Sequence, residues 1–306
     1  MKSLKRKYQS QSLGDKLISV LTYVFFAAFA FVCIYPFYYM FINTISANDI
    51  SQKGVIIFLP QQIHIKNYID AVKIPGLLNA AVVSVGRTLI GTLLTVVATA
   101  FLGYMFTRET MWRRKFWYRF IVITMYINAG IIPWFITMRN LHLTNNFLAY
   151  ILPGIVSPFN MILAKTFIES VPKELEQAAE IDGAGTMKVF FQVIIPVIKP
   201  IMATVAIFTA VGQWNSFQDT LLLMTNDKLY TLQYILYQYI NQASSLKTLI
   251  NSTTSSANIV QNLATVQTAT SIRMTVTIIV VAPILLIYPI FQRYFVKGIM
   301  IGAVKG

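Results

Sequence analysis

The sequence is poor in the residues that disulfides and metal centres require. Its single cysteine, Cys33, rules out a disulfide within the chain and a cysteine-ligated metal cluster. The two histidines, His64 and His142, lie far apart in predicted loops, and no Cys, Asp or Glu pattern accompanies either one. No H-E-x-x-H motif or comparable cluster of nucleophile and base is present, which argues against an enzyme.

A phosphate-binding loop is also missing. No G-x-x-x-x-G-K-[ST] segment occurs, so this chain cannot bind ATP in that way. Any ATP-driven activity therefore has to draw its energy from another subunit.

Charge is scarce, and apolar residues dominate. Charged residues make up 12% of the chain, hydrophobic residues make up 56%, and the mean hydropathy is +0.61. A soluble domain with an ordinary polar surface is not this apolar. We therefore predict an all-α, polytopic membrane protein.

Six apolar segments are long enough to cross a bilayer, which takes about 20 residues in a helix. The first is too long for the core of a cleavable signal peptide, which has about 7 to 15 residues, so we interpret it as an uncleaved anchor. Pro and Gly interrupt the third and fourth segments. The six are residues 17–41, 79–106, 117–138, 147–167, 201–224 and 273–294.

The distribution of basic residues predicts the topology. With six spans, 17 of the 25 Lys and Arg residues fall on the side of the two termini, which the positive-inside rule assigns to the cytoplasm of the cell. The net charge of +14 then follows from topology and anionic lipid, and nucleic acid need not be invoked. We expect a cytoplasmic N-terminus (1–16), a transmembrane domain (17–298), an extracytoplasmic loop (225–272) and a cytoplasmic tail (299–306).

A charged segment, residues 169–200, separates two of the apolar runs. Pro172 suits the first position of a short helix, and Gly183 suits its C-terminal stop. After Gly185 a second helical pattern leads toward Pro196 and Pro200. A helix with small residues on one face is well shaped to enter a groove of another protein, although an ordinary solvated loop would have the same pattern.

The residues of this segment resemble the EAA loop of permease subunits of ATP-binding cassette (ABC) importers. The matching elements are the Ala pair, the Asp-Gly-Ala triplet and the terminal proline, whereas Gln177 stands where that family usually has glutamate. Glu176 beside it could offer the missing charge. The resemblance implies a coupling helix that docks into the ATPase subunit through Glu176, Gln177, Ala178, Ala179, Asp182 and Gly183.

The fifth apolar segment contains a polar cluster that includes Ser216 and Gln218, and its candidates for the substrate pathway are Gln213, Trp214, Asn215 and Asp219. Amide and carboxylate groups beside an aromatic ring suit a sugar, whose hydroxyls need hydrogen bonds and whose ring faces stack on aromatics. The same side chains could instead hold helices together. Arg87 is predicted near the membrane level of Asp219, and because both charges are costly there we hypothesise a salt bridge between them.

Two further asparagines, Asn128 and Asn160, lie in the interrupted third and fourth segments. For these we favour a role in contacts between helices. In the loop 225–272, apolar and tyrosine residues recur at helical spacing from Tyr230 to Ile240, which predicts a short amphipathic helix. Such a helix could simply pack on the membrane surface.

Over nearly its whole length the chain resembles the MalG-like carbohydrate permeases, and most of all their branch related to lipoprotein and polysaccharide uptake in Gram-positive bacteria. The fold implied is the MetI-like fold of type I ABC importers. Further residues that carry the resemblance are the FTAVGQWNSF and YTLQYIL stretches. In maltose-type permeases the loop after the fifth helix can enter the binding protein, which implies such a contact here through Tyr230, Tyr234 and Tyr237.

The resemblance also implies partners and a mechanism. The partners are a second homologous permease, a cytoplasmic ATPase dimer that binds ATP and Mg, and a lipid-anchored or periplasmic sugar-binding protein. The mechanism is import by alternating access, with no cofactor bound by this chain itself. An ion-coupled secondary transporter is the alternative. It would need an ion site, for which Asp219 alone offers little support, and an inverted repeat, which we do not find in the sequence.

Overall fold

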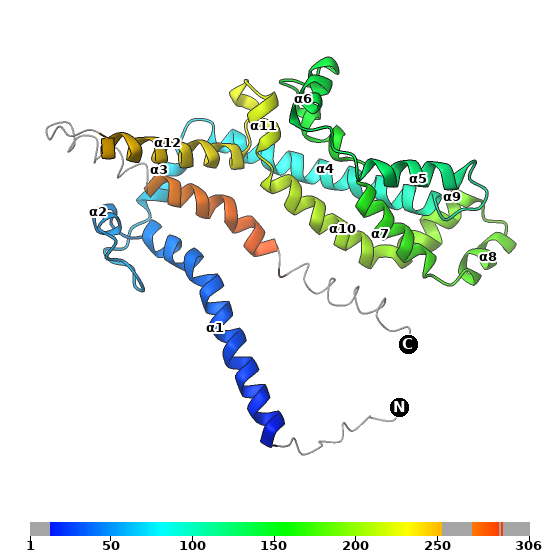
Figure 1. Ribbon diagram of the computed structural model, residues 1–306, viewed down its shortest axis with the longest axis horizontal. Coiled ribbons are helices and arrows are strands. Elements are labelled where there is room, and N and C mark those ends of the chain that lie inside the picture. Colours follow the sequence, from blue (N-terminus) through cyan, green and yellow to red (C-terminus); the bar gives the residue numbers. More distant parts are fainter. Residues whose placement is uncertain (1–12, 253–270, 288, 290–306) are drawn as a thin grey trace. The chain divides into compact units, whose positions relative to one another are not determined.

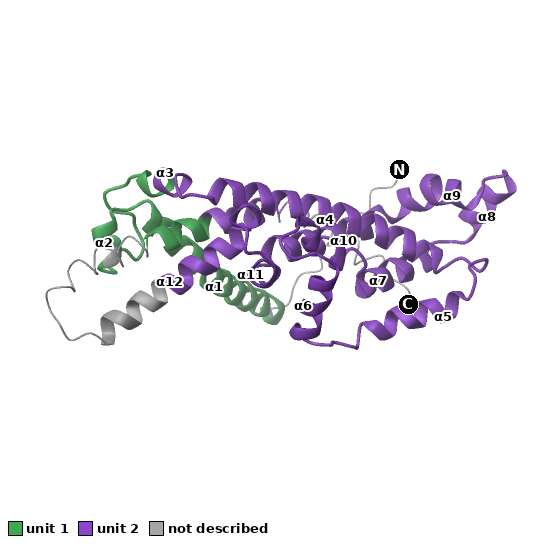
Figure 2. Ribbon diagram, turned by 90° about the horizontal axis from the view of Figure 1, so that it is seen from above, with its two compact units in different colours: residues 1–69, 255–278 green, residues 70–254, 279–306 purple. Residues whose placement is uncertain are grey.

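The computed structural model describes residues 13–252, 271–287 and 289, and every regular element in that part of the chain is helical. The predicted N-terminal segment up to residue 12, the loop residues 253–270 and the tail 299–306 lie outside the described residues. The chain forms two compact units, residues 1–69 with 255–278 and residues 70–254 with 279–306 (Figure 2).

The elements follow one another as a series of long helices joined by short helical turns (Figure 1). They are α1 (Leu13–Thr44), α2 (Asn48–Gln52), α3 (Lys66–Val72), α4 (Leu77–Met105), α5 (Arg114–Thr124), α6 (Ile131–Asn140), η1 (Phe147–Tyr150), η2 (Leu152–Gly154), α7 (Pro158–Glu169), α8 (Glu174–Ile181), α9 (Thr186–Val189), the π-helical turn η3 (Phe190–Ile194), α10 (Ile195–Asn215), α11 (Gln218–Leu223), η4 (Asp227–Leu229), α12 (Leu232–Ser252) and a last helix, Ser271–Ile287.

The first unit is built around α1, whose apolar side chains are exposed along most of its length. The chain beyond α1 is fastened to its C-terminal end by polar contacts. Asn67 donates to the carbonyl of Thr44 at 2.9 Å, and the hydroxyl of Tyr38 donates to the carbonyl of Phe58 at 2.5 Å. An exposed apolar helix of this length is what a bilayer accommodates.

The core of the second unit lies where α4, α7 and α10 pack side by side (Figure 1). Small residues allow the closest approach, because a Cβ on Gly103 of α4 would lie 2.9 Å from the Cβ of Ala164 on α7. One buried cluster joins these helices to α9 and η3, and its members are Ala100, Tyr104, Ala164, Ile168, Val189, Phe190, Ile194, Ile198, Met202 and Val205. A second cluster surrounds η1, α6 and the end of α11.

The third and fourth predicted segments are both broken. Residues 117–138 do not form one helix, because the chain leaves α5 after Thr124 and α6 begins only at Ile131. Gly130 makes this break with a φ of +86°, and its N–H donates to the side chain of Asn128. In the fourth segment η1 and η2 are bent by 45° from α7 around Pro158, as the prolines predicted.

The fifth helix differs from its predicted bounds, 201–224. It runs without interruption from Thr186 to Asn215, so the second half of the charged segment 169–200 belongs to it. The π-helical turn directly before Pro196 provides a wider turn where this proline has no N–H to donate. At the other end the helix stops at Ser216, and residues predicted to continue it form α11.

By length and composition, α1, α4 and Thr186–Asn215 can each cross a membrane, and the bent pair Phe147–Gly154 and Pro158–Glu169 would add a fourth span. The last helix, Ser271–Ile287, is apolar but shorter, and it lies within the predicted sixth segment. The described residues therefore contain three spans, or four with the bent pair.

Candidate functional site

Helix α8 carries the residues that were predicted to couple to an ATPase. It begins at Glu174, two positions after Pro172, so this proline precedes the helix rather than opening it. Asp182 caps the C-terminus, and Gly183 follows with a φ of +78°. The N–H of Ala184 then returns to the carbonyl of Ala179 at 2.9 Å, which satisfies a free carbonyl of the last turn. The predicted short helix with a glycine stop is confirmed.

The two faces of α8 differ. Ala179, together with Ala184, packs against the core of the second unit. On the other side Gln177, Ala178 and Asp182 are exposed, as is Gly183. Leu175 and Ile181 are also exposed, by 45% and 86%, although both are large and apolar. Exposed apolar side chains on a short polar helix are typical of a contact surface.

Arg108 ties α8 to the basic turn between α4 and α5. Its Nη1 lies 2.6 Å from Glu176 Oε2, and its Nη2 bonds Glu180 one helical turn further on. Burial opposes the charged form of Arg108, but its bonds to Glu180 and Glu176 raise its pKa above the usual value. Glu176 is therefore engaged within the chain, and it is not a free substitute for the glutamate that Gln177 replaces.

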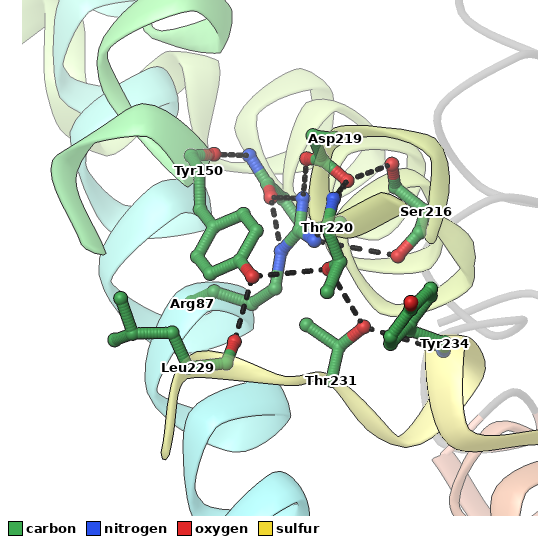
Figure 3. Close-up of polar contacts among 9 residues, drawn as sticks. Arg87, Tyr150, Ser216, Asp219, Thr220, Leu229, Thr231 and Tyr234 are labelled. Atoms are coloured by element: carbon green, nitrogen blue, oxygen red, sulfur yellow. Dashed lines mark hydrogen bonds and ion pairs between the residues drawn. The ribbon is translucent and has the colours of Figure 1, made fainter. Parts of the chain in front are cut away.

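Arg87 forms a second charged site in the middle of α4. With 3% of its side chain exposed, it forms a bidentate pair with Asp219 of α11, at 2.6 Å and 3.2 Å (Figure 3). The hypothesised salt bridge is confirmed. Asp219 also accepts hydrogen bonds from the hydroxyl of Ser216 at 2.9 Å and from the N–H of Thr220 at 3.2 Å.

The remaining donors of Arg87 hold the break between α10 and α11. Nε and Nη2 donate to Gln213 Oε1 at 3.1 Å and 3.0 Å, and Nη1 donates to the carbonyl of Ser216 at 3.3 Å. This carbonyl lies directly beyond the last residue of α10. All three nitrogens of the guanidinium thus have acceptors inside the protein, and the ring of Tyr150 covers it at 4.4 Å.

A chain of hydroxyl groups connects this site to the start of α12. The hydroxyl of Tyr150 lies 3.0 Å from Oγ1 of Thr220, which in turn lies 3.0 Å from Oγ1 of Thr231 (Figure 3). Tyr150 also donates to the carbonyl of Leu229 at 2.7 Å. The N–H of Tyr234 in α12 donates to Thr231. The loop between α11 and α12 is therefore bonded to the Arg87 site.

The four residues of the predicted polar cluster are not brought to one place. Gln213 and Asp219 meet at Arg87, as described above. Trp214 points elsewhere, because its indole N–H donates to the carbonyl of Val280 in the last helix at 2.9 Å and its ring lines an apolar groove. Asn215 is exposed and accepts from Gln233 of α12 at 3.1 Å. Trp214 thus contacts a neighbouring helix, as the structural alternative expected.

Two polar clefts adjoin the helix breaks. We call the first the Arg87 cleft, with a volume of about 350 Å³; it is lined by Arg87, Thr95, Trp134, Ala149, Tyr150, Pro153, Gly154, Ser157, Asn160, Thr209, Gly212, Gln213, Ser216 and Asp219. The second, the Gln218 cleft, has a volume of about 430 Å³ and is lined by Asn128, Gly130, Ile131, Trp134, Ser216, Gln218, Asp219 and Leu222. The clefts share Trp134, Ser216 and Asp219. Asn128 and Asn160 therefore line cavities, where contacts between helices had been favoured.

The tyrosines predicted to contact a binding protein form an aromatic row. Tyr230 and Tyr234 pack edge to face at 4.7 Å, and Tyr237 stacks on Phe217 at 4.7 Å. All four are half-buried, whereas Leu232 and Ile235 face inward, so the predicted amphipathic helix is confirmed. Burial and the neighbouring Tyr234 raise the pKa of Tyr230, whose hydroxyl keeps its proton at neutral pH.

Sequence reasoning missed several of these contacts. Arg108 entered the sequence analysis only through the count of basic residues. Glu176 and Glu180 lie at i and i+4 and repel each other, which favours one basic partner for both. Trp134 carries no such signal, and Gln218 was recognised only as part of the polar cluster, because their shared cleft depends on how two helix breaks meet. Within the described residues no group of three His, Cys, Asp or Glu side chains is placed to hold a metal ion.

Comparison with known proteins assigns the chain, with its polar clefts and exposed α8, to a family. The sequence model of binding-protein-dependent transport system inner membrane components matches residues 96–301. The chain belongs to this family. It is accordingly the permease of a binding-protein-dependent ABC importer, and it is not the ATPase. The family assigns it to the inner membrane.

Relatives in Bacillus subtilis match nearly the whole chain. The protein LplC is 30% identical over 96% of both chains. The polygalacturonan/rhamnogalacturonan transport system permease protein YtcP is 28% identical, over 96% of this chain and 100% of its own. The melibiose/raffinose/stachyose import permease protein MelC is 27% identical, over 89% of this chain and 91% of its own.

A solved structure confirms the fold. A chain of a bacterial ABC transporter involved in the import of the acidic polysaccharide alginate aligns with a TM-score of 0.81. The alignment covers 94% of this chain and 99% of the other, at 24% sequence identity. At this identity the likeness establishes the permease fold alone.

Proposed function

We propose that this permease imports carbohydrate, an oligosaccharide or a fragment of a polysaccharide, as one of two homologous membrane subunits. The observation that carries the proposal is the pair of polar clefts at the helix breaks, where amide, hydroxyl and carboxylate groups lie beside Trp134. Broken helices at membrane depth require a cavity or neighbours to satisfy their backbone groups. The names of the relatives YtcP and MelC, which specify saccharides, support the same class of substrate.

We propose six membrane spans with both termini in the cytoplasm. Two contacts support this arrangement. The basic turn at Arg108 bonds α8, which suits two cytoplasmic segments, and at the other end of α4 the side chain of Asn79 bonds the carbonyl of Lys228 in the predicted external loop. We retain the domain boundaries at residues 16 and 298, and the external loop 225–272.

The proposed coupling site is the exposed face of α8, through Gln177, Ala178, Asp182 and Gly183. Ala179 and Glu176 support it from inside the chain. Its partner is a cytoplasmic ATPase dimer that holds ATP and Mg. Closure of this dimer moves α8, and the two permeases alternate between inward-open and outward-open states.

On the outer side we propose contact with a lipid-anchored or periplasmic sugar-binding protein through Tyr230, Tyr234 and Tyr237. Gln213, Asn215 and Asp219 are proposed to border the sugar path, with Trp214 supporting them through the last helix. Asp219 is paired with Arg87, which compensates the negative charge that an ion-coupled transporter would use to hold a cation. We therefore do not carry the secondary-transporter alternative further.

Purification of the complex from its native membrane in mild detergent tests this proposal. We expect a second permease and an ATPase to co-purify with the chain. ATP hydrolysis should rise when a sugar-loaded binding protein is added. A chain that is recovered alone, with no ATPase activity under any gentle condition, would contradict the proposed assembly.

A further inference from the structure

The Gln218 cleft has groups that the proposed sugar path does not use. It lies where two breaks in the fold meet, the junction before α6 and the junction between α10 and α11. Helices α6 and α11 are side by side in both ribbon views (Figures 1 and 2). The cleft therefore has two walls, with Asn128 and Trp134 on one and Gln218 and Asp219 on the other.

Trp134 is held in place by packing and open on one side. It is half-buried and packs against the apolar cluster that contains Met138 and Leu143. It also lines both clefts. Its indole N–H has no acceptor among the residues that the structure describes. A fixed aromatic ring beside a cavity offers a flat apolar surface and one donor to a ligand.

The opposite wall has unused hydrogen-bonding capacity. The side chain of Gln218 is exposed and has no partner within the described part of the chain. Asp219 Oδ1 accepts from Arg87, Ser216 and Thr220, whereas only Arg87 is bonded to Oδ2. A carboxylate oxygen has two lone pairs, and one donor occupies Oδ2, so this oxygen can accept a further hydrogen bond. Across the cleft, the amide oxygen of Asn128 accepts a hydrogen bond from the N–H of Gly130. The NH2 group of Asn128 has no acceptor among the described residues.

We propose that the Gln218 cleft is a saccharide subsite in which one sugar ring stacks on Trp134. The hydroxyls of the ring then bond Gln218, Asn128 and the free position of Asp219 Oδ2. This inference rests on the proposed import of carbohydrate, and it moves the aromatic platform from Trp214 to Trp134. The volume, about 430 Å³, is within the range of small-ligand pockets.

The subsite recognises hydroxyl groups and a ring face rather than a carboxylate. Arg87, which is bonded to the cleft residue Asp219, directs its donors to Gln213, Ser216 and Asp219 and is nearly inaccessible. An acidic sugar therefore gains no ion pair from Arg87. Recognition by the subsite therefore depends on the ring face and the hydroxyls that a saccharide presents.

Uptake by the intact complex in proteoliposomes, with its binding protein, tests the stacking. The probes are radiolabelled arabinotriose, raffinose and trigalacturonate. For each sugar that the wild type accumulates, Trp134→Ala should lower the rate about two- to tenfold, the range expected for loss of one aromatic stack. Trp134→Phe should retain at least about half of the rate. Trp112→Ala, which removes an exposed tryptophan of the basic turn, is the matched control and should change nothing.

Photolabelling of the wild-type complex separates the possible failures and does not depend on how a variant folds. A diazirine derivative of the transported sugar should label the peptides 128–134 and 216–222. Label found only elsewhere, or full uptake by Trp134→Ala, would overturn the subsite while leaving carbohydrate import intact. A wild-type complex that accumulates none of the three sugars would overturn the proposed function, and the subsite with it.

Discussion

At the scale of single residues, the pair of Arg87 and Asp219 joins α4 to the break between α10 and α11. The guanidinium of Arg87 is nearly inaccessible, whereas the carboxylate of Asp219 is 16% exposed where it lines the two clefts. Arg87 also bonds the carbonyl of Ser216 where α10 ends. Removing one member of a buried pair leaves the other charge without compensation, which costs about 3–5 kcal/mol. The pair thus fixes the helix break that forms both polar clefts.

Neutralising Asp219 alone (Asp219→Asn) or Arg87 alone (Arg87→Met) is therefore expected to destabilise the purified protein by about 3–5 kcal/mol. The double variant Arg87→Met with Asp219→Leu should be more stable than either single variant, because no buried charge is left over. Thermal unfolding in detergent measures this. Lys73→Met is the control, since the Lys73–Asp70 pair is exposed by 72% and 51%. Independent, additive losses would contradict the coupling.

At Gly183, the conformation of the backbone requires glycine. At a φ of +78°, residue types other than Gly, and occasionally Asn or Asp, are strained by about 1–2 kcal/mol. We expect Gly183→Val to lower uptake about five- to thirtyfold, because it misplaces the end of α8, while the amount of protein in the membrane is unchanged.

Gly185→Val is the matched control for Gly183→Val. Gly185 has a φ of −69°, and a Cβ placed there would meet nothing within 4 Å. Uptake should stay near that of the wild type. If both variants transport normally, Gly183 has no role in coupling.

At the scale of elements, Arg108 positions α8 by joining it to the turn after α4. The two pairs remain partly open to solvent, so each contributes about 1 kcal/mol at most. Arg108→Gln should leave the fold intact but lower the number of sugars imported per ATP hydrolysed about two- to tenfold. The readout is this ratio, measured in proteoliposomes. Lys115→Gln, an exposed change at the start of α5, should leave the ratio unchanged; an equal loss there would indicate a general charge effect.

The elements also show what could be predicted from sequence. Helices α1 and α4 lie within a few residues of their predicted bounds, because their apolar runs are long and unbroken. The start of the fifth helix was misplaced because Pro196 and Pro200 were expected to separate the helical pattern after Gly185 from the apolar run. The π turn that precedes Pro196 has no clear sequence signal. The predicted breaks at Gly130 and Pro158 were found, since these residues alter the backbone locally.

The candidate site was predictable to a smaller extent. Arg87 and Asp219 could be paired from sequence, because each charge is too costly to stand alone within a membrane. The pattern of small residues on α8 predicted its exposed face only in part, because Ala178 is exposed whereas Ala179 packs against the core. The role of Trp134 did not, because which of two tryptophans faces a polar cleft depends on the packing of distant helices. Trp214 has the more suggestive neighbours in sequence but lines an apolar groove.

At the scale of the whole molecule, the proposed topology places the turn at Thr110 in the cytoplasm and Lys228 outside. Both residues are exposed. In a Cys33→Ser background, which removes the native cysteine, a membrane-impermeant maleimide added to spheroplasts should label Lys228→Cys. It should label Thr110→Cys only after the membrane is opened. The reverse pattern would require the opposite orientation, with α8 outside and unable to reach an ATPase.

ATP-dependent accumulation of sugar in proteoliposomes tests the central claim most directly. The complex is reconstituted with ATP in the compartment that α8 faces and a sugar-loaded binding protein on the other side. We predict that labelled oligosaccharide accumulates against its gradient only when ATP, the ATPase and the binding protein are all present. Accumulation that continues without ATP, or that follows an imposed ion gradient instead, would contradict the account.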